Sequence, residues 1–265
     1  MNHSAPNDLA STPQTLSWQE LLAQGQASRA LQHYRLSESP DGDTFEALKT
    51  LATLQSNLRE KGYSKARKTL AELETRPDLL DWQLLEAELE SLELGAKAFD
   101  ARQPEQGLAA ITDISSPLLR GETETLIGTA SVLMNEITEA RAHFEEAMRH
   151  DPRHYRAITN LGNLALEAGK VDEAIEAYEQ ALKLNDDFAN AHHNLGVAYR
   201  RKGQVNKSVR YLRKAQNATQ KQVREEARDT FRSGGAKQFA KYGRWFAYGL
   251  AAILVYLFLR SRGMI

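Results

Sequence analysis

The sequence predicts an all-α protein: a superhelix of helical hairpins, followed by a single apolar helix near the C-terminus. Three observations predict this fold class. They are a 34-residue repeat, helical hydrophobic periodicity without strand-like alternation, and one uninterrupted apolar segment. The chain has 265 residues, enough for one elongated domain or two compact ones. It is 42% hydrophobic and 26% charged, which is the balance of a folded chain rather than a disordered one.

The repeat is clearest in two segments that begin 34 residues apart, at Tyr155 and at Ala189. With Tyr155 as position 1, both copies have leucine at position 7, glycine at positions 8 and 15, and alanine at position 27. A weaker third copy covers residues 121–154, with Gly128 at position 8 and Asn135 in place of the glycine at position 15. This pattern resembles the tetratricopeptide repeat (TPR) family.

The resemblance implies that each unit is a pair of helices around a tight turn, and that the units stack into a right-handed superhelix. Small residues at positions 8, 20 and 27 allow the helices to approach closely, and larger residues such as Tyr178 fill the remaining gaps. A single hairpin cannot bury its apolar face, so the hairpins must stack.

The whole chain divides into segments by these patterns. Three divergent hairpins are expected in 15–120, because helix-like pairs surround Gly25, Gly62 and the segment 102–104. The expected divisions are a disordered N-terminus at 1–14, divergent hairpins at 15–120, three repeats at 121–154, 155–188 and 189–220, a capping helix at 221–233, a basic juxtamembrane neck at 234–244, and a transmembrane helix at 245–259.

Charge is distributed unevenly along the chain. Residues 1–199 carry 18 basic and 32 acidic residues, whereas residues 200–244 carry 14 basic and 3 acidic residues. A basic segment of this kind usually meets a polyanion. Because an apolar segment follows directly, lipid headgroups are the expected polyanion and no nucleic acid is expected. The headgroup contacts are assigned to Lys237, Lys241 and Arg244.

The apolar segment 245–259 predicts a membrane anchor. With its aromatic and basic flanks, a helix over 242–262 reaches about 31 Å, enough for a hydrocarbon core of about 30 Å. A buried core helix and a helix lying in the membrane surface are the alternatives, but the segment has no polar face. The protein is expected to cross the membrane once, with the repeats in the cytoplasm. The anchor residues are Trp245, Phe246, Tyr248, Leu250, Ile253, Leu254, Val255, Tyr256, Leu257, Phe258 and Leu259.

The concave groove of the superhelix is the expected peptide site, lined by the first helix of each repeat. Some members of the family clamp a C-terminal carboxylate there, and Asn163, Asn194, Arg224 and Arg228 match that clamp in part, whereas Thr159 replaces its lysine. An acidic C-terminal peptide is therefore one candidate ligand. The expected groove residues are Arg156, Thr159, Asn160, Asn163, Asn190, His193, Asn194, Val197, Arg200, Arg201, Arg224 and Arg228.

Catalytic chemistry is not indicated. The chain has no cysteine, which excludes disulfides, thiolate nucleophiles and cysteine-bound metals. His143, His150 and His154 lie close in sequence, but they occupy ordinary repeat positions, so no metal, cofactor or enzyme activity is expected. The expected function is a membrane-tethered scaffold or adaptor that recruits a soluble partner. The alternative is a structural subunit that self-associates or braces a larger membrane complex; the oligomeric state stays open.

Overall fold

The computed structural model describes residues 16–37, 40–225 and 227–228, and these residues form helices and turns without any strand. A helix that covers 205–225, here named the last helix, follows α11. The preceding helices are α1 (Trp18–Ala23), α2 (Ala27–Tyr34), α3 (Gly42–Arg59), α4 (Tyr63–Ala71), α5 (Trp82–Asp100), α6 (Pro104–Ile111), α7 (Pro117–Leu133), α8 (Ile137–His150), α9 (Tyr155–Glu167), α10 (Val171–Leu184) and α11 (Ala189–Arg201).

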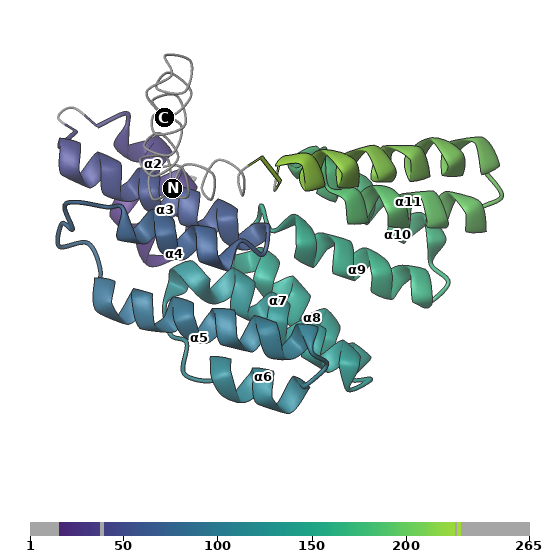
Figure 1. Ribbon diagram of the computed structural model, residues 1–265, viewed down its shortest axis with the longest axis horizontal. Helices are drawn as coiled ribbons and strands as arrows, with labels where there is room; N and C mark the ends of the chain where they lie inside the picture. Colours follow the sequence, from purple (N-terminus) through teal and green to yellow (C-terminus); the bar gives the residue numbers. More distant parts are fainter. Residues whose placement is uncertain (1–15, 38–39, 226, 229–265) are drawn as a thin grey trace, which may run out of the picture.

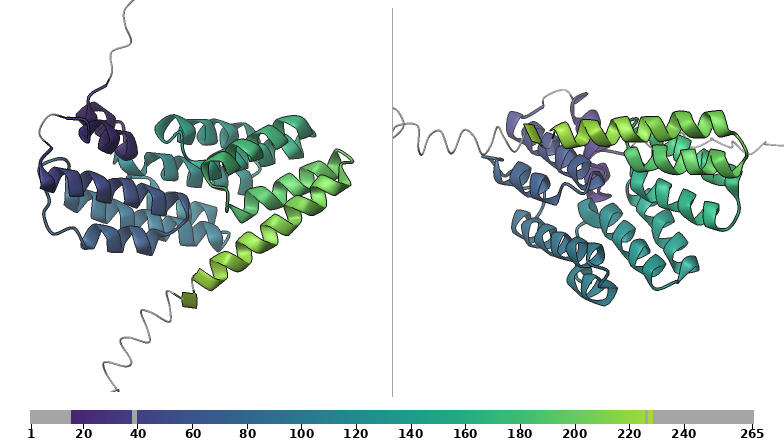
Figure 2. Two further views of the ribbon diagram at one scale, coloured as in Figure 1. Left: turned by 90° about the horizontal axis from the view of Figure 1, so that it is seen from above. Right: turned by 45° about the vertical axis from the view of Figure 1, so that its right-hand side comes forward.

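The helices of the described ranges pair into six consecutive hairpins, the last being α11 with the last helix. Figure 1 shows the chain winding from α1–α4 through α5–α8 to an arm made of α9, α10, α11 and the last helix, in which α9 packs against α8. The views in Figure 2 show that the last helix lies along the outside of this arm. The all-helical fold class expected from the repeat pattern is confirmed in this part of the chain.

Each hairpin turns at one residue with a left-handed backbone. These residues are Gly25, Lys61, Arg102, Asn135, Gly169 and Gly203. In the fifth turn, the Gly169 amide donates to the Leu166 carbonyl at 3.2 Å and the Lys170 amide donates to the Ala165 carbonyl at 2.9 Å. The same pair of bonds closes all six turns, which is the Schellman arrangement. Repeat position 15 therefore sets the turn whether or not it is glycine. In the second hairpin, Lys61 takes this conformation, not the Gly62 around which the turn was expected.

Small residues at position 8 hold the two helices of a hairpin close together, as expected. A Cβ atom on Gly128 would lie 2.7 Å from the Phe144 ring, and one on Gly162 would lie 2.7 Å from the Tyr178 ring. The partner ring occupies position 24 of the same repeat. These contacts explain why the repeat pairs a small residue at position 8 with a large one at position 24.

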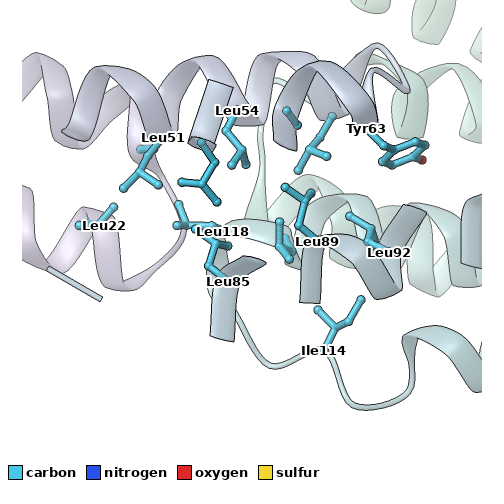
Figure 3. Close-up of a cluster of buried hydrophobic side chains, with 14 of the residues drawn as sticks. Leu22, Leu51, Leu54, Tyr63, Leu85, Leu89, Leu92, Ile114 and Leu118 are labelled. Carbon is cyan, nitrogen blue, oxygen red and sulfur yellow. The ribbon is translucent and has the colours of Figure 1, made fainter. Parts of the chain in front are cut away.

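The first seven helices share one apolar core, which includes Leu51, Leu89 and Leu118 (Figure 3). Polar side chains reinforce it. The amide of Gln55 on α3 donates to the Gly25 carbonyl at 2.5 Å and to the Leu118 carbonyl at 3.1 Å. A Cβ on Gly25 would meet the Pro117 carbonyl oxygen at 2.1 Å, so this contact requires glycine. As a result α7, the first helix of the weakest repeat, packs against α3, α5, α6 and α8, and only its end, at Val132 and Leu133, has exposed apolar side chains.

The C-terminal part differs from the expected division. The last helix runs through 205–225 without interruption, whereas a repeat ending at 220 and a separate capping helix at 221–233 were expected. The physical reason is that no glycine or proline lies between Gln204 and Ser233 to end the helix. None of the helices in the described ranges is long and apolar enough to cross a membrane. The expected anchor at 245–259 and the neck at 234–244 lie outside the described residues.

Candidate peptide-binding cleft

A cleft of about 550 Å³ lies where the N-terminal hairpins meet the repeat arm. Its walls are the turn between α3 and α4, the start of α9, the loop between α10 and α11 with the start of α11, and the end of the last helix. These elements come from three different hairpins, the second, the fifth and the sixth. The cleft is therefore a product of the whole superhelix rather than of one repeat.

An ionic cluster buried beside the cleft joins the N-terminal hairpins to the arm. Glu122 of α7 accepts hydrogen bonds from the Tyr63 hydroxyl at 2.5 Å, from His154 Nε2 at 2.9 Å and from Arg156 at 2.9 Å. Arg156 also donates to the carbonyl of Leu58 at the end of α3, at 3.2 Å. Because α3, α4, α7 and α9 all contribute, the cluster fixes the angle between the two halves of the described chain.

The protonation states in this cluster follow from its geometry. Burial alone would raise the pKa of Glu122, but Arg156, His154 and the Tyr63 hydroxyl outweigh burial and lower that pKa to about 2. Burial lowers the pKa of Arg156, but Glu122 outweighs it and the net direction is upward. Burial and then Glu122 raise the pKa of Tyr63. Glu122 and Arg156 are thus an ionised pair, and the Tyr63 hydroxyl, His154 and the Leu58 carbonyl provide further hydrogen bonds to it.

A second ion pair joins α3 to the loop between α8 and α9, near the same junction. Arg59 of α3 forms a bidentate pair with Asp151, which follows α8, with Nε to Oδ2 at 2.6 Å and Nη2 to Oδ1 at 3.0 Å. Both side chains are nearly buried. Gly121 permits this approach, because a Cβ there would lie 2.9 Å from the Asp151 Cβ.

The open surface of the cleft is mixed in character. The Tyr155 and Phe188 rings pack at 4.8 Å between centroids and form an apolar patch on one wall. Asn190 presents its amide beside them, whereas the Asn185 side-chain oxygen already accepts from the Asp187 amide at 3.1 Å, and Lys65 and Glu225 carry charges of opposite sign. The start of α11 also opens here, and no side chain caps its amide groups. Amides that both donate and accept, next to aromatic rings, suit the backbone and side chains of an extended peptide.

Two of the expected groove residues are not available to a ligand. Arg156 has a side chain only 11% exposed and is held by Glu122. Thr159 is buried, and its hydroxyl donates to the Tyr155 carbonyl at 2.8 Å. The expected exposure of these two positions on the concave face is therefore wrong, because the ionic cluster and neighbouring helices cover the first turns of α9.

Asn163 and Asn194 are brought together, on α9 and α11. Asn163 Oδ1 accepts from Asn194 Nδ2 at 2.8 Å and from the Tyr178 hydroxyl at 2.8 Å. The two amides therefore link neighbouring repeats and leave only part of their hydrogen-bonding capacity for a ligand.

The other expected groove residues lie on accessible surface. Arg201 also donates to the Leu166 carbonyl at 2.6 Å, which ties α11 to the end of α9. Only Asn190 and Arg156 of the expected groove residues line the cleft itself. Half-buried residues are Asn160, Asn163, Asn194 and Val197, and exposed residues are Asn190, His193, Arg200, Arg201, Arg224 and Arg228.

The carboxylate clamp is not assembled as expected. It requires Arg224 and Arg228 on a third inward helix, one repeat after α11. Arg224 instead lies on the last helix, the second helix of its hairpin, and Arg228 follows on the same stretch.

The three histidines that were considered as metal ligands have different partners. His143, His150 and His154 each bind a different carboxylate, Glu124, Glu146 and Glu122, and no group that could hold a metal occurs among the described residues.

Several residues of the site were missed from the sequence. Glu122 carries the opposite charge to Arg156 at the same repeat position, 34 residues earlier. That inversion was the available signal for an ion pair between successive repeats. Tyr63, Arg59 and Lys65 gave no signal, because their approach to α7, α9 and α11 depends on how the divergent hairpins curve back.

Comparison with known proteins agrees with the repeat pattern. A model described as TPR repeat matches residues 162–203, and two models described as tetratricopeptide repeat match residues 132–177 and 189–222. No curated protein matches the chain by sequence.

Among solved structures, the chain is similar to a crystal structure of MamA, with 21% identity, 64% of this chain and 95% of that chain covered, and a TM-score of 0.42. A second crystal structure of MamA has 22% identity, coverage of 66% and 95%, and a TM-score of 0.41. A MamA RS-1 double mutant has 16% identity, coverage of 67% and 96%, and a TM-score of 0.40. By its family matches and the helical hairpins that they cover, the chain carries tetratricopeptide repeats across residues 132–222.

Proposed function

We propose that this protein is a scaffold, without catalytic activity of its own, that holds a peptide segment of a soluble partner in the cleft. The single observation that carries the proposal is the cleft of about 550 Å³, with walls from three hairpins. Stacked helical repeats use extended inner surfaces of this kind to bind other proteins. The first turns of α7 are unsuited to this role, because Glu122, Thr125 and Leu126 are buried there.

The lining favours an extended peptide over a strongly anionic ligand. Arg59, Arg156 and Lys221 line the cleft but are already paired with Asp151, Glu122 and Asp187. The charges left are of both signs, whereas the Asn190 amide and the half-buried Phe188 ring remain on its surface. A peptide that adds one apolar side chain and several backbone groups matches this surface.

We further propose that residues 245–259 tether the scaffold to a membrane, with the repeats on the cytoplasmic side. The support is in the sequence: an uninterrupted apolar segment, flanked by aromatic residues and preceded by a basic stretch. Lys237, Lys241 and Arg244 are placed to contact anionic headgroups in this arrangement. The cleft then concentrates a soluble partner at the membrane surface.

The cleft can be tested with peptides selected from a displayed random library against the full chain. In the Asn190→Arg variant the larger side chain fills the cleft beside Tyr155. We expect the Kd of a selected peptide to rise at least about tenfold, a loss of about 1.4 kcal/mol. Asn206→Arg makes the same change on the exposed start of the last helix and should leave the Kd unchanged. Equal effects of both variants would place the peptide elsewhere.

A further inference from the structure

The last described hairpin ends in a surface that has a buried counterpart one repeat earlier. In that earlier repeat, Val171, Ile175, Tyr178 and Leu182 of α10 pack against α11. Stepping forward 34 residues gives Val205, Val209, Leu212 and Gln216 on the last helix. The surface formed by these four residues is named the end face.

The end face has the form of a helix-binding surface without its helix. Ile175 is 8% exposed beneath α11, whereas its counterpart Val209 is 53% exposed and Val205 is 62% exposed. Nothing in 16–37, 40–225 or 227–228 covers these two valines. With the half-buried Leu212, which packs beside Gly196 of α11, and the polar Gln216, the two valines lie along one side of the last helix at a spacing of four, three and four residues. Such a stripe matches the apolar seam of another helix.

Charge distinguishes the end face from its buried counterpart. In the earlier repeat, Glu179 accepts a hydrogen bond from the Tyr199 hydroxyl of α11 at 2.8 Å. The equivalent of Glu179 on the last helix is Arg213. The equivalent of Asp172, which pairs with Lys202, is the neutral Asn206. The two carboxylates that contact α11 are thus replaced by the cationic Arg213 and the neutral Asn206. A helix that binds the end face must therefore supply the negative charge itself.

We propose that the end face binds an acidic amphipathic helix of a partner protein, in the place that the first helix of a further repeat would occupy. A carboxylate at the position equivalent to Tyr199 then pairs with Arg213, and small apolar residues cover Val205 and Val209. This goes beyond the proposed cleft function, since none of these residues lines the cleft.

Charge complementarity selects this occupant over two others. The last helix carries six basic residues and one acidic residue between 205 and 225, so two copies packed through their end faces would repel. The chain's own residues 229–265 contain six basic residues and one acidic residue, so they match the end face no better. An acidic helix from a different protein satisfies both the apolar stripe and Arg213.

The first test uses the absence of cysteine from the chain. Full-length Val209→Cys and Ser208→Cys variants are each treated with a thiol-alkylating reagent at low protein concentration. We expect fast alkylation at position 209 and slow alkylation at position 208, since Ser208 is buried. Slow alkylation of Val209→Cys would show that another part of this chain covers the end face, which overturns the proposal.

The second test measures binding of two stapled helical peptides with the α11 sequence, residues 189–201. Stapling is needed because helices of this length are marginal in water. Both peptides carry Arg200→Glu, and they differ only in Tyr199→Glu or Tyr199→Lys. We expect the full-length protein to bind the first peptide at least about fivefold more tightly than the second, which corresponds to a charge pair of about 1 kcal/mol.

Variants of the protein make this result specific. Arg213→Glu should reverse the preference between the two peptides, and Val209→Asp should remove binding of both. Arg153→Glu makes the same charge change in an exposed loop and should change neither Kd. Equal affinity for the two peptides, or a preference that survives Arg213→Glu, would overturn the proposal. So would concentration-dependent dimerisation that Val209→Asp abolishes, because the occupant would then be a second copy. The cleft variant Asn190→Arg should leave these affinities unchanged, so the two proposals fail independently.

Discussion

Glu122 illustrates how single residues hold the two halves of the described chain at a fixed angle. Its side chain is 1% exposed, yet its carboxylate stays ionised because Arg156, His154 and Tyr63 surround it. A buried ion pair contributes little compared with a well-packed apolar pair, but removing one partner leaves an uncompensated buried charge. The value of the cluster therefore lies in requiring α4, α7 and α9 to meet in one arrangement.

Burial of the Glu122–Arg156 ion pair predicts strong energetic coupling between the two residues. Glu122→Gln leaves the Arg156 charge buried and unpaired, and Arg156→Met leaves the Glu122 charge in the same state. Each single change should lower the free energy of unfolding by about 3–5 kcal/mol, and the double variant should lower it by much less than the sum. Chemical denaturation of the four proteins measures this coupling.

A control for this cycle is Glu139→Gln, which removes an exposed carboxylate from α8 and should change stability by less than about 0.5 kcal/mol. Strictly additive losses for Glu122→Gln and Arg156→Met would show that the two side chains do not act on each other.

His192 predicts a pH dependence. It occupies repeat position 4, is buried between α11 and the last helix, and stacks on Tyr211 at 5.9 Å. Burial lowers its pKa from 6.5, so the folded chain keeps it neutral while the unfolded chain protonates it as pH falls below 6.5. Stability should therefore fall as pH drops through that value. In His192→Phe, which keeps the aromatic stack, the fall between pH 7 and pH 5 should be smaller in denaturation measurements. An unchanged pH dependence would contradict this role.

At the residue scale, the sequence predicted packing better than ionic contacts. The contacts of Gly128 with Phe144 and of Gly162 with Tyr178 followed from repeat spacing, because both partners lie in one hairpin. The expectation for Arg156 was wrong, because its partners Glu122, Tyr63 and the Leu58 carbonyl come from three other helices. Contacts between divergent hairpins depend on superhelix curvature, which local sequence does not determine.

At the element scale, the hairpin turn is the unit that repeats most faithfully. All six turns in the described ranges share one backbone geometry, although three of the six key residues are not glycine. A left-handed conformation costs a non-glycine residue about 1 kcal/mol or more, so Lys61, Arg102 and Asn135 carry a local strain that helix packing offsets. Because residues other than glycine take this conformation in the second, third and fourth turns, the glycine pattern at position 15 predicted only the fifth and sixth turns.

A pair of glycine substitutions tests the turn geometry. Gly169 has a φ of +78°, and a Cβ there would meet nothing within 4 Å, so Gly169→Ala carries a purely conformational cost. We expect it to lower the free energy of unfolding by about 1 kcal/mol. Gly42→Ala is the matched control, because its Cβ also meets nothing, at the start of α3 with an ordinary backbone. Gly42→Ala should be neutral or stabilising in thermal denaturation, and equal losses would contradict the turn assignment.

The last helix shows where element boundaries could not be predicted. The repeat period suggested a break near residue 220, but the helix needs a breaking residue to end and 205–225 contains none. Its length removes the expected separate cap and leaves Val205 and Val209 uncovered by the described chain. The end face is thus exposed in the described chain because no residue ends the last helix early and allows a separate cap to fold over it.

At the scale of the whole molecule, the N-terminal hairpins change what the repeats can bind. They share a core with α7 and meet α9 through the ionic cluster, which leaves the cleft and the faces of α9 and α11 as the open inner surface. The sequence predicted the number of hairpins and their order. It did not predict that the N-terminal hairpins pack on α7 and contact α9, because the divergent hairpins lack the repeat residues that fix stacking geometry.

The charge distribution differs between the two ends of the molecule. Acidic residues dominate up to residue 199, and basic residues dominate from 200 to 244, immediately before the apolar segment 245–259. In the proposed arrangement the basic end lies against an anionic membrane and the cleft faces the cytoplasm. The repeats then act as a scaffold at that surface.

The most direct test of this arrangement is alkaline extraction of membranes that contain the full chain, compared with a version that ends at Ser233. The shorter version keeps every described helix but lacks the basic neck and the apolar segment. We predict that the full chain stays in the membrane pellet and that the shorter version is released. Release of both versions would contradict the membrane-tethered scaffold and would assign 245–259 to contacts within a soluble complex.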